Sequence, residues 1–384
     1  MAEFARWPVS IDVGVLFVGG RHQAPHVAPV AAELARRPDV KVTGYATTGE
    51  DAEAITAMLH VLDTTLEIVP MQLPHILERF VHNRPAKIAR LLTWQGRLRG
   101  HDVLLTAERT STILKRLAKA VPCLVHIPHG AGDRAKGFEG RLAHFDHIIV
   151  SGEKDRRRMI ADGLVEAAQC TVSGSIKLDY VAYAKPNLPR LFDNALPTIL
   201  YNPHFSRSLS SWPSWGIELV ERLSEDPSWN LIVAPHIRTL ATMTRKERKQ
   251  WEALVDTPRR RIDYRSDALI DMTYTRSADI YVGDVSSQVY EFVAAPRPCV
   301  FLNANRVDWK GSADFLMWRF GAVADTVEAA LAEIAAARLR HVEFAAIQEN
   351  AAFDALGSRD GCAAARAADA VINTVSGLWP TSPR

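Results

Sequence analysis

Two adjacent serines follow an apolar run that is expected to form a buried strand over 279–283. Ser286 and Ser287 stand where the next helix must begin, and Asp284 precedes them in the same turn. Free backbone N–H groups and the positive end of a helix dipole bind anions at such a position, so we expect the serines to hold a pyrophosphate. Glu291 lies on the same helix face, where its carboxylate can accept hydrogen bonds from a ribose diol. The alternative is an ordinary N-cap serine followed by a surface glutamate.

A histidine and a glycine, His129 and Gly130, follow another expected strand over 123–127. They therefore lie at the carboxyl end of a strand, where open α/β sheets bind their ligands. A neutral imidazole, with an ordinary pKa of about 6.5, can take a proton from an acceptor hydroxyl, which makes His129 a candidate general base. Gly130 lets the backbone approach a ligand, and Asp133 in the same loop could orient His129 or meet a phosphate. A polar loop without chemistry is the alternative.

Two further loops at strand ends carry cationic and hydroxyl side chains. His236 ends an apolar run and Arg238 lies two residues on, and an imidazole with a guanidinium suits a phosphate clamp. His236 is therefore the second catalytic candidate, with Arg238 on the donor phosphate. The other loop follows the strand expected over 198–202 and contains His204, Ser206, Arg207 and Ser208. We expect Ser206 and Arg207 to bind donor phosphate as well, with loop polarity alone as the alternative.

These loops belong to a chain in which short apolar runs alternate with helical patterns. Such alternation predicts parallel sheets with helices on both faces. The first series of expected strands spans 11–18, 42–46, 103–107, 123–127 and 147–150, and the second spans 198–202, 230–236, 261–264, 279–283 and 298–303. Helices are expected over 25–37, 327–339 and 361–375.

The two series are separated by the segment 180–197, which contains three prolines and no sustained period. This composition is typical of a linker. The sequence therefore predicts an α/β protein of two Rossmann-like domains. Residues 1–185 form the acceptor-side domain and residues 186–355 the nucleotide-donor domain, and residues 356–384 form a helix that packs back across the domains.

The composition excludes several other classes of protein. A net charge of +2, from 46 basic and 44 acidic residues, argues against a surface built for nucleic acid, so no nucleic-acid partner is expected. No apolar stretch reaches the roughly 18 residues of a membrane-spanning helix, and the N-terminus lacks a secretory pattern, so we expect a cytoplasmic protein. The 4 cysteines are far apart and no cluster of metal ligands stands out, so no metal is expected.

One segment, residues 76–100, carries six basic residues and a single acidic one, with Phe80 and Trp94 among its apolar residues. A basic amphipathic face with aromatic anchors can lie on an anionic membrane surface. The segment predicts a peripheral protein on the inner face of the cytoplasmic membrane, with a solvated helix face as the alternative.

The second domain resembles the CDP-glycerol glycerophosphotransferase family, of the teichoic acid polymerase type. That family shows D-x-S-S after a strand, an acidic residue four positions beyond the second serine, and a G-K-P-like turn into the next strand. The segment GDVSSQVYEFVAAPRPCVFLN keeps Asp284, Ser286, Ser287, Glu291 and Pro298. The resemblance covers most of residues 120–305 and extends to His129-Gly130, to SGSIKLD, to YNPHFSR and to His236.

This resemblance implies a GT-B fold, with two Rossmann-like domains facing across a cleft. It implies a transferase that moves a polyol phosphate, such as glycerol phosphate, from a CDP-linked donor to a hydroxyl of a cell-envelope glycan or glycolipid, releasing CMP. His129 would act as base, His236 with Ser286 and Ser287 would hold the pyrophosphate, and Glu291 would bind the ribose. The nucleotide-linked donor, CDP-glycerol or a related molecule, would be a substrate, and no cofactor is expected.

Two other functions fit the same pattern. A GT-B glycosyltransferase with a CMP- or UDP-sugar donor, or a UDP-sugar 2-epimerase, would reuse the phosphate site, because fold alone does not choose the chemistry. A non-catalytic nucleotide-binding protein could keep the fold without turnover.

Overall fold

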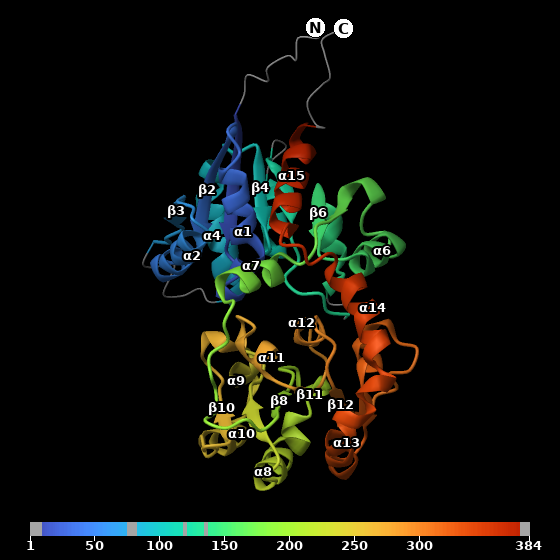
Figure 1. Cartoon of the computed structure of the whole chain (residues 1–384). Helices are drawn as coiled ribbons and strands as arrows, with labels where there is room; N and C mark the ends of the chain where they lie inside the picture. Colours follow the sequence, from blue (N-terminus) through green and yellow to red (C-terminus); the bar gives the residue numbers. More distant parts are fainter. Residues whose placement is uncertain (1–9, 75–82, 118–120, 134–136, 377–384) are drawn as a thin grey trace. The chain divides into compact units, whose positions relative to one another are not determined.

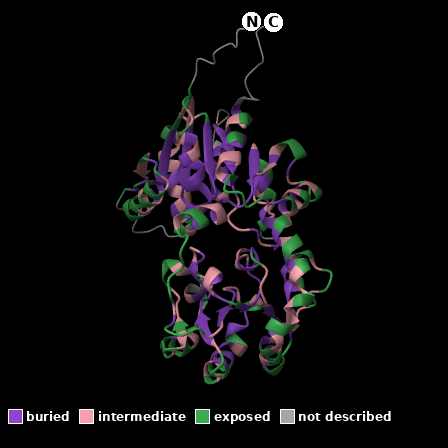
Figure 2. Ribbon diagram, viewed as in Figure 1, coloured by how far each residue is buried: buried purple, intermediate pink, exposed green. Residues whose placement is uncertain are grey.

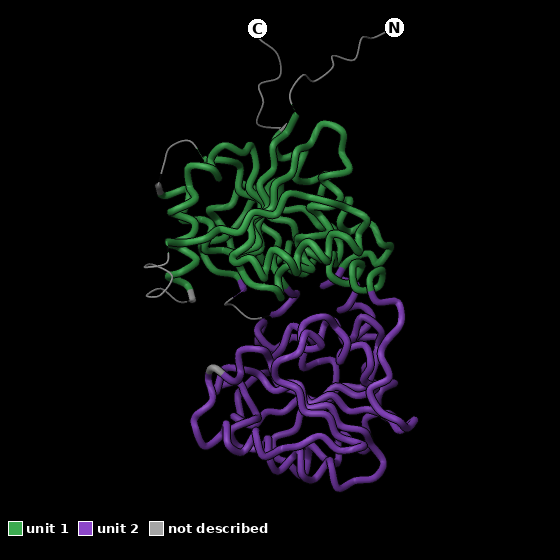
Figure 3. The backbone as a smooth tube through the Cα atoms, turned by 90° about the vertical axis from the view of Figure 1, so that its left-hand side faces the viewer, with its two compact units in different colours: residues 1–129, 138–184, 357–384 green, residues 130–137, 185–356 purple. Residues whose placement is uncertain are grey.

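The computed structural model describes residues 10–74, 83–117, 121–133 and 137–376 of the chain. The chain folds into two compact units, which Figures 1 and 3 show. Unit 1 comprises residues 1–129, 138–184 and 357–384, and unit 2 comprises residues 130–137 and 185–356. Each unit is built on one sheet of parallel strands.

The sheet of unit 1 has 7 parallel strands in the order β3-β2-β1-β4-β5-β6-β7. These strands are β1 (Ile11–Phe17), β2 (Val40–Ala46), β3 (Glu67–Pro70), β4 (Val103–Thr106), β5 (Cys123–His126), β6 (His147–Val150) and β7 (Cys170–Val172). The strand order reverses between β1 and β4. At such a switch point the loops diverge from the carboxyl ends of neighbouring strands and leave a crevice for ligands.

The sheet of unit 1 is apolar on both faces, as parallel sheets covered by helices are. Val13 and Val15 of β1 pack into a core with residues of α1 (Ala24–Ala35) and α15 (Ala363–Ser376). Leu16 packs into a second core with residues of α4 (Asn83–Leu98). Among the described residues of unit 1, the other α-helices are α2 (Gly49–Val61), α5 (Ile113–Leu117), α6 (Glu153–Ala161) and α7 (Ile176–Ala184). Figure 2 shows the strands as buried and the outer faces of the helices as exposed.

The chain re-enters unit 1 at Gly357, which has a φ of +69°. A Cβ atom there would lie 2.6 Å from the carbonyl oxygen of Ser151, so only glycine fits this close approach. Helix α15 then packs against α1 and α7. Its Arg366 donates from Nε to the carbonyl oxygen of Ser173 at 2.7 Å, which fixes the helix over the end of β7.

The sheet of unit 2 has 6 parallel strands in the order β10-β9-β8-β11-β12-β13. These strands are β8 (Thr198–Asn202), β9 (Asn230–Val233), β10 (Arg260–Ile262), β11 (Ile280–Gly283), β12 (Cys299–Leu302) and β13 (Ala322–Ala324). The helices are α8 (Ile217–Glu225), α9 (Thr239–Thr242), α10 (Arg245–Glu252), α11 (Thr273–Ser277), α12 (Gln288–Phe292), α13 (Val327–Arg340) and α14 (Ala345–Leu356), with shorter helical turns between them. The order reverses between β8 and β11, which is the switch point of unit 2.

The observed elements differ from the sequence-based expectation at one boundary that bears on the site. The first residues of the expected linker 180–197 are helical, because α7 continues to Ala184. Ile176 and Val181 are buried on α7, and the first proline comes only at Pro186, so nothing stops the helix earlier.

Candidate functional site

The switch point of unit 2 is organised around one buried carboxylate, Asp284, the residue that follows β11. Asp284 is 0% exposed. Its Oδ2 accepts hydrogen bonds from the backbone N–H of His204 at 2.8 Å and from that of Ser211 at 2.9 Å. Asp284 therefore ties the loop that follows β8 to the end of β11.

The other oxygen of Asp284, Oδ1, has no hydrogen-bond partner among the residues that the structure describes. Burial raises the pKa of Asp284 to about 7, although the N–H groups of His204 and Ser211 oppose this shift. The group can therefore gain or lose a proton near neutral pH.

The two predicted serines lie at the expected place, but the helix after them is short. Ser287 is the N-cap of α12, which spans only Gln288–Phe292. The Oγ of Ser286 accepts the backbone N–H of Gln288 at 3.2 Å. A single helical turn has little macrodipole, so local N–H groups and hydroxyls are what this turn offers to an anion.

The loop that begins with Gly130 lies against Ser287 within unit 2. Gly130 has a φ of +96°, and a Cβ atom on it would lie 3.1 Å from the Oγ of Ser287. Asp133, in the same loop, is 1% exposed. Its Oδ1 accepts from the hydroxyl of Tyr290 at 2.6 Å and its Oδ2 from the backbone N–H of Met317 at 2.9 Å.

The two histidines of the rim of unit 2 gather around one aromatic ring. The centroid of the Phe205 ring lies 4.4 Å from that of His204 and 4.7 Å from that of His236, and the guanidinium of Arg238 lies 5.5 Å from it. The Nδ1 of His236 accepts the backbone N–H of Arg238 at 3.1 Å, and the Nδ1 of His204 accepts that of Ser206 at 3.0 Å. Each imidazole is thus held by its own loop.

Arg207, which the sequence placed on a donor phosphate, is paired inside unit 2. Its Nη1 donates to both carboxylate oxygens of Glu247, at 2.5 and 2.7 Å. Glu247 also caps the first turn of α10 through the backbone N–H of Thr244. The charge of Arg207 is therefore balanced by the carboxylate of Glu247, a pairing that no spacing along the sequence predicts. A small cavity beside this pair is lined by His204, Phe205, Arg207, Trp212, Thr239 and Glu247, among others.

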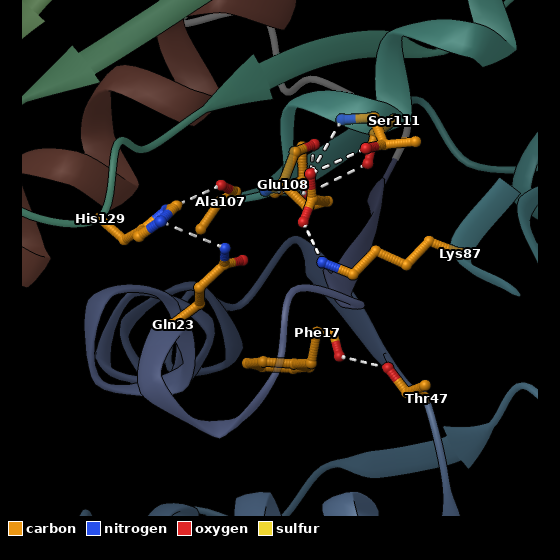
Figure 4. Close-up of polar contacts among 10 residues, drawn as sticks. Phe17, Gln23, Thr47, Lys87, Ala107, Glu108, Ser111 and His129 are labelled. Carbon is orange, nitrogen blue, oxygen red and sulfur yellow. Dashed lines mark hydrogen bonds and ion pairs between the residues drawn. The ribbon is translucent and has the colours of Figure 1, made fainter. Parts of the chain in front are cut away.

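The candidate base, His129, lies in unit 1, past the end of β5, and Figure 4 shows its contacts. Its Nδ1 lies 3.3 Å from the carbonyl oxygen of Ala107, and its Nε2 lies 3.5 Å from the Nε2 of Gln23. A carbonyl only accepts and an amide nitrogen only donates, so these contacts fit a neutral ring with the proton on Nδ1. The lone pair is then on Nε2, which is the arrangement that a general base needs.

Two further histidines lie near His129. The ring of His22 meets that of His129 edge to face, with centroids 5.4 Å apart. His26 is buried in the first turn of α1, and burial lowers its pKa well below the ordinary value, with the neighbouring Lys177 adding to the shift. His129 therefore lies beside a second imidazole that stays neutral.

An ion pair that the sequence did not single out lies at the end of β4, also in Figure 4. Lys87 donates to Glu108, which also accepts from the backbone N–H and the hydroxyl of Thr110 at 3.1 and 2.9 Å. Burial alone would raise the pKa of Glu108, but the hydrogen bond and charge of Lys87, together with Thr110, lower it to about 2. The position of Glu108 directly after an expected strand was the signal that could have revealed it.

The basic segment 76–100 falls partly outside the described residues. In its described part, Lys87 pairs with Glu108, Arg90 is buried and donates from Nε to the carbonyl oxygen of Met71 at 3.2 Å, and Arg97 pairs with Glu67 at 3.2 Å. These charges serve contacts within unit 1, and association with an anionic membrane stays a prediction. In the part of the chain that the structure describes, no helix is both long and apolar enough to cross a membrane. Nor do the described residues include a cluster of three or more His, Cys, Asp or Glu side chains placed to hold a metal ion.

No protein-family model matches the chain, and no curated protein sequence matches it. Solved structures, in contrast, are similar over nearly its whole length. A Listeria monocytogenes protein described as a UDP-N-acetylglucosamine 2-epimerase is 15% identical, with a TM-score of 0.67 over 98% of this chain and 99% of that one. The UDP-GlcNAc 2-epimerase of Neisseria meningitidis, bound to UDP-GlcNAc, is 12% identical, with a TM-score of 0.64 over 96% of this chain and 100% of that one. The wall teichoic acid polymerase TagF is 10% identical, with a TM-score of 0.61 over 97% of this chain and 90% of that one.

These similarities confirm the predicted fold class: the chain has a GT-B fold of two Rossmann-like units. At such low identity they carry the fold and no particular activity. They also do not single out the CDP-glycerol family, because the epimerases and the polymerase resemble the chain to a similar degree.

Proposed function

We propose that the protein is an enzyme that acts on a UDP-linked sugar, as a glycosyltransferase or a 2-epimerase. The observation that carries this proposal is the setting of His129, an imidazole held between a carbonyl and an amide with its Nε2 as an acceptor. The similarity of the fold to structures that bind UDP or UDP-GlcNAc by their own description supports a uridine nucleotide as the carrier.

In a glycosyl transfer, the Nε2 of His129 takes the proton of an acceptor hydroxyl. The hydroxyl oxygen bonds to the anomeric carbon while the bond from that carbon to the diphosphate breaks, and UDP leaves with the electron pair. In a 2-epimerisation the same imidazole would instead take the proton from the second carbon of the sugar. The electron pair of that bond would form a double bond to the anomeric carbon while the bond to the diphosphate breaks. UDP would then add back to the anomeric carbon as a proton returns to the other face of the second carbon. In both reactions Ser286, Ser287 and Arg238 donate hydrogen bonds to the diphosphate, and Glu291 accepts them from the ribose.

A second candidate is transfer of a polyol phosphate from a CDP-linked donor such as CDP-glycerol. It is favoured by the run Asp284, Ser286, Ser287 and Glu291, which keeps the spacing of the CDP-glycerol family. In that reaction the acceptor oxygen would attack the β-phosphate, and CMP would leave.

A panel of donors separates these reactions by the nucleotide that is released. We would incubate the protein with UDP-GlcNAc, UDP-glucose, CMP-Kdo, CDP-glycerol and CDP-ribitol, then measure free nucleotide and the configuration of the recovered sugar. Release of UDP, or epimerised UDP-sugar, is the expected result. If CMP is released only from CDP-glycerol or CDP-ribitol, the proposal is wrong and the second candidate function is supported. Binding of UDP without turnover of any donor would indicate that the protein is a non-catalytic nucleotide-binding protein.

A further inference from the structure

The short loop that follows His129 folds as part of unit 2, although the residues before it belong to unit 1. Figure 3 shows the division between the two units. Asp133 is the residue that fixes this loop, because it is 1% exposed and both of its carboxylate oxygens accept hydrogen bonds. A buried carboxylate is retained in a loop only when such bonds repay its desolvation.

The two donors come from elements that lie far along the chain. The hydroxyl of Tyr290, on α12, lies 2.6 Å from Oδ1 of Asp133. The backbone N–H of Met317, in the 3-10 helix Ala313–Phe320, lies 2.9 Å from Oδ2. Tyr290 is itself 1% exposed and its ring meets that of Phe320 edge to face, so its hydroxyl has a fixed position.

The same turn of the chain carries the candidate donor-binding residues. Ser287 is the N-cap of α12, and Glu291 is the residue after Tyr290. Gly130 and Gly132 pack against Ser287: a Cβ atom on Gly130 would lie 3.1 Å from its Oγ, and one on Gly132 would lie 3.4 Å from its Cβ. The loop is therefore held on α12 at its start by the glycines and at Asp133 by Tyr290.

We propose that Asp133 and Tyr290 are positioning residues that link the donor-binding turn of α12 to the placement of the base, His129. The inference rests on the proposed function. His129 is the residue directly before Gly130, so the contacts that hold this loop on α12 also restrain the backbone of His129.

The sharpest variant is Tyr290→Phe, which removes one hydroxyl and keeps the buried ring. Tyr274→Phe is the matched control, because the hydroxyl of Tyr274 also donates to a carboxylate of unit 2, Asp263, at 2.7 Å. Both variants lose one tyrosine-to-aspartate hydrogen bond, so a merely structural effect on stability is expected in both.

With the donor that the panel identifies, Tyr290→Phe should lower kcat about 10- to 100-fold, because a small misplacement of a reacting group has effects of this size. The KM for the donor should change by less than about 3-fold, since the diphosphate contacts remain. Tyr274→Phe should leave both constants near those of the wild type. An unchanged kcat in Tyr290→Phe, or equal losses in the two variants, would overturn the proposal.

A measurement on His129 itself does not depend on turnover. The imidazole resonances of His129, assigned with His129→Gln, should change their chemical shifts in Tyr290→Phe and keep them in Tyr274→Phe, because only Tyr290 of the two tyrosines holds the loop that begins after His129. This measurement needs no reacting donor. It therefore distinguishes a failure of the proposed function from a failure of the positioning role. Identical chemical shifts of His129 in the wild type and in Tyr290→Phe would refute that role.

Discussion

Each sheet carries a carboxylate at an equivalent strand end, partly buried in unit 1 and fully buried in unit 2, and the pKa values of the two carboxylates shift in opposite directions. Glu108 follows β4 beside the reversal of unit 1, and Asp284 follows β11 beside the reversal of unit 2. The pKa of Glu108 is lowered to about 2, whereas that of Asp284 is raised to about 7. Burial acts on both. The difference is that Glu108 has the ammonium of Lys87 beside it, whereas Asp284 is held by uncharged donors of His204 and Ser211.

This contrast indicates a division of roles between the units. In unit 1 the strand ends carry His129, the candidate base, and the pair of Lys87 and Glu108, which stays charged at neutral pH. In unit 2 the carboxyl of Asp284 holds the backbone of the loop after β8 and ionises only near neutral pH. We therefore expect unit 1 to govern turnover and unit 2 to govern nucleotide affinity.

Replacement of the candidate base, His129, tests this division of roles and is expected to have the largest effect of the variants proposed. His129→Ala is expected to lower turnover by about 10²- to 10⁴-fold, the usual contribution of a general base. The affinity for UDP, measured by calorimetry, should stay close to that of the wild type. The double variant Ser286→Ala and Ser287→Ala should instead weaken UDP binding by about 10-fold or more, through loss of hydrogen bonds worth about 1 kcal/mol each.

The matched control for the base is His144→Ala, which exchanges an exposed histidine of the same unit. It should leave both turnover and affinity unchanged. If His129→Ala weakened UDP binding as much as it slowed turnover, the proposed division between the units would be wrong.

The raised pKa of Asp284 makes a prediction about stability. In the folded state its pKa is about 7, against an ordinary value of 3.8. Its stabilising contribution is therefore complete below about pH 4 and is lost as the pH rises through 7, where the buried group must carry charge. Asp284→Asn keeps an oxygen for the two N–H groups and never ionises. Relative to the wild type, this variant should gain up to about 3 kcal/mol between pH 5 and pH 8, measured by urea unfolding.

The same experiment compares the stability difference between the wild type and Asp284→Asn at pH 5 with the difference at pH 8. At pH 5 the wild-type carboxyl is mostly protonated, so the two proteins should then differ mainly by the new amide group. A constant difference between pH 5 and pH 8 would mean that Asp284 does not titrate in this range, and that a cation compensates it as Lys87 compensates Glu108.

The sequence predicted the inner strands of both sheets and missed three strands at the edges. β3, β7 and β13 are outermost in their sheets, and each spans only three or four residues. An edge strand is covered on fewer sides, so it needs no long apolar run, and EIVP, CTV and AVA carry too weak a pattern. Inner strands such as β1 must be apolar on both faces, which is why their runs stand out.

The sequence also located the strand-end residues of the site but not their partners. His129, Asp284 and Ser286 follow apolar runs, and parallel strands bring their carboxyl ends to one edge. The amide of Gln23 lies 106 residues from His129 along the chain. Contacts of this kind arise from the order of strands in the sheet, and no spacing along the sequence encodes them.

The smallest effect is expected from removal of the cation beside Glu108. In the wild type the pKa of Glu108 lies below the ordinary value of 4.5, so its contribution to stability is present above that pH and is lost as the pH falls toward 2. Lys87→Met leaves the carboxylate partly buried without its cation, and should cost about 1 to 2 kcal/mol at pH 7. The cost should shrink below about pH 5, as Glu108 becomes protonated in the variant.

Lys115→Met is the matched control, because Lys115 pairs with Asp146 at 2.6 Å elsewhere in unit 1, where both side chains are about a third exposed. An exposed pair contributes little, so this variant should lose less than about 1 kcal/mol at pH 7. Equal losses in the two variants, measured by urea unfolding, would mean that the pair at the end of β4 is an ordinary surface ion pair. The carboxylates of the two units would then differ only in burial, and the contrast between a charged and a neutral switch point would fail.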